Sequence, residues 1–259
     1  MSYRNIVLPP GARSFSQSDW IDWAVDERLF LSVAPKLSPE CRLCFGAVGL
    51  DSVGTPYSFC QHCWNYRTIL GVVPILYSVD EGLESLLHMY KDDKPPRKWM
   101  SIPLASVLDD FLKEHLDCVQ SMYGKIDIAT TVPNSSATRD FNHVDLVVEQ
   151  MPHPRVPWDL TIVRKSPGPR PERGVIESSS FLVNPFSKIE DKTVLLLDDT
   201  WTSGSTIASV AKTLLLAGAL RVVALPIGRQ LHAGWGQAAT LIRDATARGY
   251  SNTRCVICG

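Results

Sequence analysis

The sequence predicts an α/β fold in which a mainly parallel sheet is flanked by helices. Two continuous apolar runs, "TVLLLDD" (193–199) and "RVVALPI" (221–227), flank a stretch with helical spacing. A third strand-like run, "IDIATTVP" (126–133), precedes another helical stretch. Strands buried on both faces are apolar throughout rather than alternating, and strands that alternate with helices form a parallel sheet. The pattern therefore predicts three strands of one parallel sheet.

The remaining elements follow from apolar spacing and from the positions of Pro and Gly. Apolar residues at helical spacing predict helices in the segments 18–31, 77–93, 103–116 and 141–151 and from Ser205 to a stop at Gly218. Residues 152–192 are rich in Pro, Ser and Arg. We expect little regular structure in that stretch beyond "DLTIVRK" (159–165).

Length and composition exclude several classes of protein. The 259 residues are 45% hydrophobic and 20% charged, which is ordinary for a globular protein. A net charge of -1 and a pI near 6.6 give no global basic field, so nucleic-acid binding would need a local patch. The sequence contains no apolar run long enough to cross a bilayer, and its start lacks the apolar region of a signal peptide. We therefore expect a cytoplasmic protein that does not insert into membranes.

Four cysteines near the N-terminus have the spacing of a zinc site. Cys41 and Cys44 form one Cys-x-x-Cys pair, and Cys60 and Cys63 form a second after fifteen intervening residues. Each pair offers two thiolates, and the linker returns the second pair to complete a tetrahedron. The pattern predicts a structural Zn²⁺ ion, and the alternative is two turns of reduced cysteines. His62, between two of the ligands, is expected to face solvent.

Three further cysteines are harder to interpret. Cys255 and Cys258 form a Cys-x-x-Cys pair at the end of the chain. This pair is compatible with a redox dithiol, with additional zinc ligands or with an idle tail. Cys118, within a predicted helix, is expected to be a small core residue.

The end of the strand "TVLLLDD" carries the main candidate site. Ligands of open α/β sheets bind at the carboxyl ends of the strands, and the amides at a helix N-terminus favour phosphate. Gly204 would allow a backbone to approach a ligand closely. The hydroxyl-bearing residues around it are Thr202, Ser203, Ser205 and Thr206. The loop therefore has the composition of a phosphate cradle.

Asp198 and Asp199 would repel a bare phosphate beside this loop. They are understandable if they accept hydrogen bonds from sugar hydroxyls or lie near a Mg²⁺ ion. A nucleotide hydrolase also has acidic residues after an apolar strand, but it needs a Gly-x-x-x-x-Gly-Lys-Ser/Thr loop. The only Gly-Lys pair here, Gly124-Lys125, is followed by Ile126. A purely structural role as a helix cap requires one such residue, not a cluster.

The stretch "VLLLDDTWTSGST" resembles the phosphoribosyl-diphosphate (PRPP) binding motif of the type I phosphoribosyltransferases. The resemblance implies the type I phosphoribosyltransferase fold, with Asp198 and Asp199 holding the ribose hydroxyls. It also implies that residues 202–206 cradle the 5′-phosphate and that Mg²⁺ acts on the pyrophosphate leaving group. Trp201 stands at a variable position of the motif, either as surface filler or as a stacking wall.

A four-cysteine module ahead of such a domain resembles the ComF family, which is associated with DNA uptake in competent bacteria. "MYKDD" (89–93) and "VPNSSATRDFNHVDLVVEQM" (132–151) resemble two further family segments. The resemblance implies that Lys91 and Arg139 lie around the pyrophosphate. The sequence departs from the family pattern at Asp140, which replaces Gly, and at His143, which replaces Gln.

The resemblance implies three parts of the chain and leaves two functions open. The parts are an N-terminal extension (1–38), a four-cysteine zinc knuckle (39–75) and a phosphoribosyltransferase-like domain (76–259). The chain is expected to transfer ribosyl phosphate from PRPP to an unidentified acceptor. The alternative is a non-catalytic accessory protein that binds PRPP or handles DNA, with single-stranded DNA or competence proteins as partners. A third hypothesis, ranked below these two, is a thiol–disulfide enzyme that uses Cys255 and Cys258.

Overall fold

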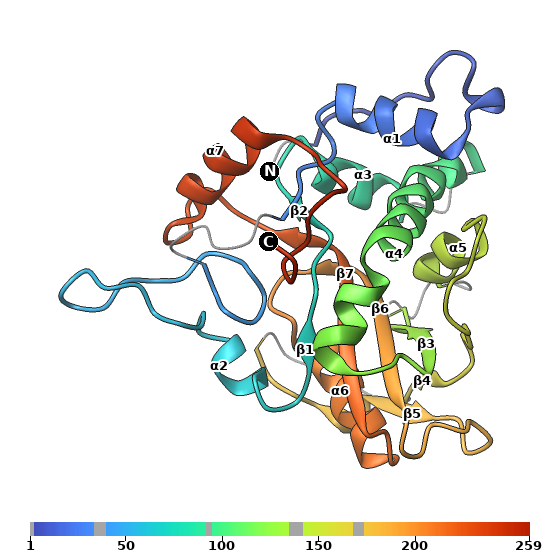
Figure 1. The fold of residues 1–259 in the computed structure, drawn as a ribbon, viewed down its shortest axis with the longest axis vertical. Helices are drawn as coiled ribbons and strands as arrows, with labels where there is room; N and C mark the ends of the chain where they lie inside the picture. The colour runs from blue at the N-terminus through green and yellow to red at the C-terminus, as the bar shows by residue number, and fades with distance from the viewer. Residues whose placement is uncertain (1–2, 34–39, 92–94, 135–141, 168–173) are drawn as a thin grey trace.

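A parallel sheet lies at the centre of the computed structural model, which describes residues 3–33, 40–91, 95–134, 142–167 and 174–259 (Figure 1). Its strands lie in the order β1 (Gly71–Val72), β7 (Arg221–Gln230), β6 (Thr193–Trp201) and β3 (Ile128–Thr131). β2 (Leu76–Ser78) pairs with β7 farther along the same edge, and every pairing in this sheet is parallel. The predicted parallel α/β architecture is confirmed at this level.

Two hydrophobic clusters cover the two faces of the sheet. On β6, Leu195 and Leu197 belong to one cluster, and Val194 and Leu196 belong to the other. This alternation follows from the two-residue period of a strand. The continuous apolar run is therefore explained by burial on both faces.

Helices from distant parts of the chain cover the first face. These are α1 (Gln17–Asp26), α3 (Leu83–Met89), α4 (Ser101–Tyr123), α5 (His143–Glu149) and α7 (Ala238–Arg248). α1 begins with a capping box in which Ser16 and Asp19 satisfy each other's backbone amides. α4 is the longest helix among the described residues and ends at Gly124, which has a φ of 85°.

The second face is covered by α6 (Ser205–Leu216) and a small hairpin. β4 (Val163–Lys165) and β5 (Phe181–Val183) form this antiparallel pair, and the 3₁₀ turn Ser178–Ser180 leads into it. α6 ends before Gly218, whose φ of 99° fits the predicted helix stop. The hairpin lies in the stretch for which we expected little regular structure, so only its first strand was anticipated.

α7 was not predicted. Its buried residues, Ala238, Leu241 and Ala245, follow helical spacing, but two of the three are alanines, which give a weak apolar signal. Among the helices in the described part of the chain, none combines the length and apolar character that a membrane span requires.

The cysteine module packs against the second face of the sheet. The short helix α2 (Cys63–Tyr66) lies in this module. Two 3₁₀ turns, Ala12–Ser14 and Pro95–Met100, lie elsewhere in the chain. Tyr66 is fully buried and makes an edge-to-face contact with Trp201, with ring centroids 6.2 Å apart. Trp201 is 0% exposed, so it is a core residue rather than surface filler or a stacking wall. The boundaries 1–38, 39–75 and 76–259 stay a prediction.

Candidate functional site

Asp198 and Asp199 lie near the carboxyl end of β6 and point to opposite faces of the sheet. Successive residues of a strand alternate, so Asp199 follows Leu195 and Leu197 toward the helices of the first face. Asp199 is 4% exposed, whereas Asp198 is half-buried. The two carboxylates predicted to act together therefore have different surroundings.

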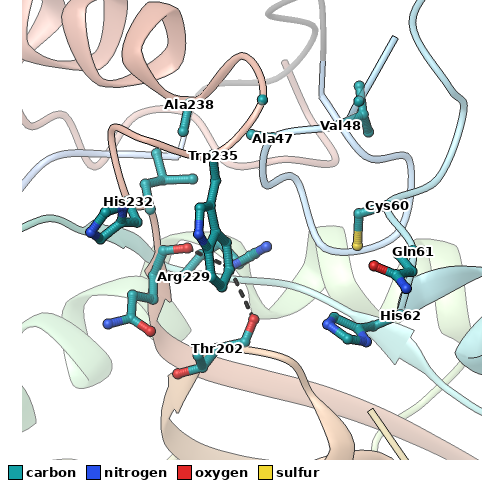
Figure 2. A pocket seen from close by; sticks show the side chains of 14 residues that line it. Ala47, Val48, Cys60, Gln61, His62, Thr202, Arg229, His232, Trp235 and Ala238 are labelled. Carbon is teal, nitrogen blue, oxygen red and sulfur yellow. Dashed lines mark hydrogen bonds between the residues drawn. The ribbon is translucent and has the colours of Figure 1, made fainter. Parts of the chain in front are cut away.

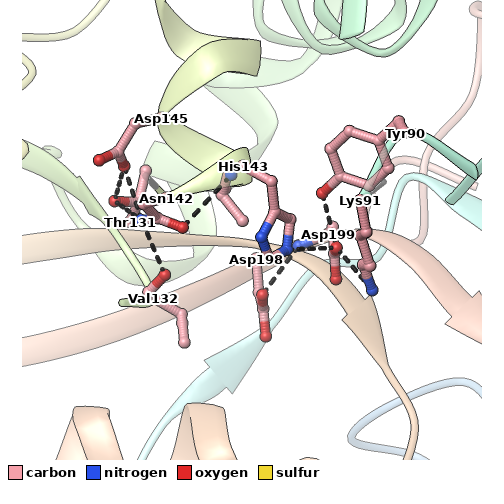
Figure 3. A network of polar contacts seen from close by, with 10 residues as sticks. Tyr90, Lys91, Thr131, Val132, Asn142, His143, Asp145, Asp198 and Asp199 are labelled. Carbon is pink, nitrogen blue, oxygen red and sulfur yellow. Dashed lines mark hydrogen bonds and ion pairs between the residues drawn. The ribbon is translucent and has the colours of Figure 1, made fainter. Parts of the chain in front are cut away.

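One oxygen of Asp199 is the centre of a polar network (Figure 3). Its Oδ2 atom accepts a hydrogen bond from the Tyr90 hydroxyl at 2.6 Å and lies 2.9 Å from Nε2 of His143. The ammonium of Lys91 lies 2.8 Å from the same oxygen. Three groups from α5 and the end of α3 therefore hold this carboxylate against the sheet.

The network fixes the charge of Asp199. Burial raises the pKa of this carboxyl, but the charge of Lys91 and the hydrogen bond with His143 outweigh burial and hold the pKa well below its ordinary value. Burial lowers the pKa of Lys91, and Asp199 more than offsets it, so the net shift is upward. Asp199 and Lys91 thus form an ion pair in which the carboxylate is buried and the Lys91 side chain is partly exposed.

Asp198 is compensated less, because it forms no ion pair with a described residue and the charge of Lys91 offsets its burial only in part. The one hydrogen bond to its carboxylate comes from the backbone amide of Asp199, at 2.9 Å. Burial first, and then the charge of Asp199, raise the pKa of Asp198 well above its ordinary value. A cation or a hydroxyl donor from outside would relieve this unfavourable charge.

The loop after β6, which is the candidate phosphate cradle, leads directly into α6. Gly204 has a φ of 79° and immediately precedes α6. A Cβ atom at this position would lie 2.2 Å from Cζ2 of Trp201, so only glycine fits. The hydroxyls of Ser203 and Ser205 lie 3.0 Å apart and are buried, whereas Thr202 and Thr206 are partly exposed.

A second network fixes the start of α5 to the end of β3. The Asn142 side chain caps α5 by accepting from the Val144 amide, and it donates to the Val132 carbonyl at 3.1 Å. Asp145 accepts hydrogen bonds from Asn142 and from the Thr131 hydroxyl. Burial is the main reason that the pKa of Asp145 is raised. This network determines where His143 stands beside Asp199.

Most of the predicted site residues therefore lie around one strand end. Asp198, Asp199, Lys91 and the loop 202–206 are brought together there. Arg139 and Asp140 lie outside the described residues. Tyr90 was not singled out from the sequence, although it adjoins Lys91. His143 was noted only as a departure from a family pattern.

The four cysteines of the N-terminal module converge on one point. The sulfurs of Cys41, Cys44, Cys60 and Cys63 all lie within 4.8 Å of one another, and those of Cys44 and Cys60 are 3.9 Å apart. Sulfurs around a tetrahedral zinc ion with bonds of about 2.3 Å are about 3.8 Å apart. Three of the cysteines are 0% exposed. The residues present therefore fit a structural metal ion such as zinc, as predicted.

Arg229, at the end of β7, connects this cluster to the loop after β6. Its Nε atom donates to the Cys44 sulfur at 3.2 Å, and its Nη1 atom donates to the carbonyls of Trp201 and Thr202 at 3.1 and 3.4 Å. Burial opposes ionisation of Cys44, but its cysteine neighbours and Arg229 hold its pKa well below the ordinary value. This contact could not be anticipated from the sequence, because 185 residues separate Arg229 from Cys44.

A pocket of about 350 Å³ lies between the cysteine module and the ends of β6 and β7 (Figure 2). Its lining includes both apolar and polar side chains. Among them are Gln61, His62, Thr202, Arg229, His232 and Trp235. Because Thr202 belongs to the loop after β6, the pocket opens beside the candidate phosphate cradle.

Comparison with models of protein families and with the sequences of curated proteins gives no match.

Proposed function

We propose that the protein binds PRPP with Mg²⁺ and transfers its ribosyl phosphate to an acceptor, releasing pyrophosphate. The observation that carries this proposal is the half-buried Asp198 carboxylate. It has no cationic contact among the described residues and stands at a strand end beside a glycine-containing loop that opens a helix. A ligand combining an anion with hydroxyl groups and a bound cation suits this arrangement.

In this proposal the loop 202–206 binds the 5′-phosphate. The amides at the start of α6 have no partner within the helix and carry partial positive charge. Gly204 keeps the backbone accessible, and the hydroxyls of Thr202 and Thr206 add donors. The type I phosphoribosyltransferase fold that the motif implies is part of the proposal.

The two aspartates divide the remaining work. Asp198 accepts from the ribose hydroxyls or lies beside the Mg²⁺ ion, because it is partly exposed. Asp199 positions Lys91 and His143. A bound Mg²⁺ ion would neutralise the charge that develops on the pyrophosphate.

The proposed reaction breaks the bond between the anomeric carbon of the ribose and a pyrophosphate oxygen. A new bond forms from the acceptor atom to that carbon, and the acceptor loses a proton. The positive charge of Lys91 lies at the carboxyl end of β6, where Asp198 and Asp199 stand. In the proposal this charge stabilises the anionic pyrophosphate as it leaves. The pocket beside Thr202 is the space we assign to the acceptor.

One observation favours the alternative, a PRPP-binding accessory protein of the ComF type without turnover. Asp199 already has three protein partners on one oxygen, so one carboxylate rather than two is readily available to the ribose. The order of a four-cysteine module and a carboxylate loop along the chain supports the ComF relationship.

Calorimetric titration of PRPP with Mg²⁺ tests the binding step. We expect the wild type to bind, the Asp198→Asn variant to lose binding, and the Asp191→Asn variant to bind normally, because Asp191 is exposed at the opposite end of β6. Absence of binding by the wild type would sink the proposal.

Pyrophosphate release with a panel of bases and nucleotides then separates the transferase from the accessory protein. Release with one acceptor, lost in Asp198→Asn, supports the transferase. Binding of PRPP without release, together with a salt-dependent shift of labelled single-stranded DNA, supports the accessory function.

A further inference from the structure

The end of the chain folds back onto α4 and brings a second group of metal-ligand residues together. His115 and Cys118 lie on α4, three residues apart and therefore on one side of the helix. Cys255 and Cys258 lie in the last turn of the chain. The four ligand atoms lie within 4.8 Å of one another, although 143 residues separate His115 from Cys258.

The distances within this group fit a small tetrahedral ion. The sulfurs of Cys255 and Cys258 are 3.5 Å apart, and Nδ1 of His115 lies 3.8 Å from the sulfurs of both Cys118 and Cys258. Tetrahedral zinc with bonds of about 2.3 Å to sulfur and about 2.0 Å to nitrogen places its ligand atoms about 3.5–3.8 Å apart.

The surroundings of His115 prepare its Nδ1 atom as a ligand. The other ring nitrogen, Nε2, lies 2.8 Å from the carbonyl oxygen of Asn252. A hydrogen on Nε2 satisfies that carbonyl and leaves the lone pair of Nδ1 directed at the three sulfurs. Metal-bound histidines are commonly oriented by such a contact with a backbone carbonyl.

The backbone of the terminal turn also prepares the sulfurs. The Cys255 amide donates to the Cys258 sulfur at 3.3 Å, and the Ile257 amide donates to the Cys255 sulfur at 3.4 Å. The four-cysteine module has the same kind of contact, from the Leu43 amide to the Cys41 sulfur at 3.5 Å. Such donors stabilise thiolates, which are the form that binds metal.

The tail is held in place before the turn begins. Asn252 and Tyr250 both donate to Asp110 on α4, at 3.0 and 3.1 Å. The Ser251 amide and the Ser32 hydroxyl are 2.8 Å apart. These contacts position the terminal turn over α4. The four ligand residues are therefore brought together by tertiary contacts, not by their spacing along the chain.

We propose that His115, Cys118, Cys255 and Cys258 form a second structural zinc site that fastens the end of the chain to α4. Three thiolates and one imidazole are a ligand set that selects zinc. This site accounts for Cys118 and His115, which a Cys255–Cys258 redox dithiol does not need. The burial of Cys255 and His115, each 3% exposed, argues against an idle tail.

The first test is the zinc content of the full-length protein, purified without chelators and measured by plasma mass spectrometry. We expect two zinc ions per chain, one for each cluster. The Cys255→Ser, Cys258→Ser double variant and the His115→Gln variant should lose half of the zinc. The matched controls Arg254→Ala and His88→Gln, both at exposed positions, should keep two.

X-ray absorption at the zinc edge tests the ligands on the wild type alone, so it does not depend on a variant that folds. One all-sulfur site and one site with three sulfurs and one nitrogen average to about half a nitrogen per zinc. Chelator-driven release should have two phases, because Cys258 is exposed whereas three cysteines of the other site are buried.

One zinc per chain with purely sulfur ligands, retained in full by the Cys255→Ser, Cys258→Ser variant, would overturn the inference. A disulfide between Cys255 and Cys258 in protein isolated under reducing conditions would overturn it as well. Neither result bears on the proposed PRPP binding, because the residues assigned to PRPP are different ones.

Discussion

The four-cysteine cluster and the carboxylate site both concentrate acidic groups, but they balance charge differently. At the cysteine cluster, four sulfurs converge and Arg229 donates to one of them, an arrangement that a metal ion completes. At the carboxylate site, Lys91 balances the charge of Asp199 and His143 contacts the same oxygen, while Asp198 has no cationic contact among the described residues. Arg229 also donates a hydrogen bond to the Thr202 carbonyl in the loop after β6, so this one side chain connects the two regions.

The difference indicates which groups serve the fold and which serve a ligand. A buried charge that the protein pairs with its own side chains is part of the structure. A half-buried carboxylate with a raised pKa and no cationic contact costs stability, and such groups gather at functional sites. By this criterion we propose that Asp199 supports the fold and that Asp198 binds the ligand, although the two are neighbours in sequence.

The largest effect should follow from breaking the cysteine cluster. Cys44→Ser removes a metal ligand and leaves the buried Arg229 without its acidic contact. We expect a loss of about 3–5 kcal/mol in the free energy of unfolding, measured by urea denaturation together with zinc content. Arg42→Ala, at an exposed position in the same module, is the control. An unchanged denaturation midpoint in Cys44→Ser would show that the cluster does not support the fold.

Asp199→Asn should have the next largest effect, because it leaves the Lys91 ammonium without its carboxylate. We expect a loss of about 2–3 kcal/mol at neutral pH, reduced from the fully buried case by the partial exposure of Lys91. The folded-state pKa of Asp199 is depressed, so its stabilisation is complete above the unfolded-state pKa of about 4 and declines below it.

Urea denaturation at several pH values checks this sign. The difference between wild type and Asp199→Asn should shrink as the pH falls from about 5 to 3. A difference that stays constant over that range would mean that Asp199 is not held by charge. Asp191→Asn serves as the control for loss of an exposed carboxylate.

Gly204→Ala tests the junction between the two regions, where Trp201 packs against both the loop and Tyr66. The backbone strain at a φ of 79° should cost about 1 kcal/mol, and the 2.2 Å contact with Trp201 should add to it. Gly54→Ala is the matched control, since Gly54 has a φ of 84° and no atom near the new Cβ. Equal losses of thermal stability in the two variants would show that Trp201 gives way.

Elements and clusters that are built from residues close together in the chain could be predicted from the sequence. The apolar run of β6, the loop 202–206 and the helix after it are contiguous, so their order and type were predictable. The four-cysteine group was equally predictable, because its ligands lie within 23 residues and their spacing reflects the turn geometry.

Contacts between distant segments were not predictable. Arg229 lies in an apolar strand and meets Cys44 only through the pairing of the sheet with the module. The grouping of His115 with Cys258 depends on the path of the chain after α7. That helix was not predicted, because its buried residues are mostly alanines and give a weak apolar signal. The different roles of Asp198 and Asp199 depend likewise on which helices cover each face.

The smallest effect on stability belongs to the most informative variant, Asp198→Asn. A carboxyl whose folded-state pKa is raised costs stability at pH values above its unfolded-state pKa of about 4, and so at neutral pH. Removing the charge should therefore stabilise the ligand-free protein by about 1 kcal/mol, or about 2–4 °C in Tm.

Thermal unfolding of wild type and Asp198→Asn, with and without PRPP and Mg²⁺, tests the central claim most directly. We predict that ligand raises the Tm of the wild type, while the variant is more stable without ligand and gains nothing from it. A variant that is less stable than the wild type, or that keeps the full ligand-induced rise in Tm, would contradict the assignment of Asp198 as the ligand-binding carboxylate.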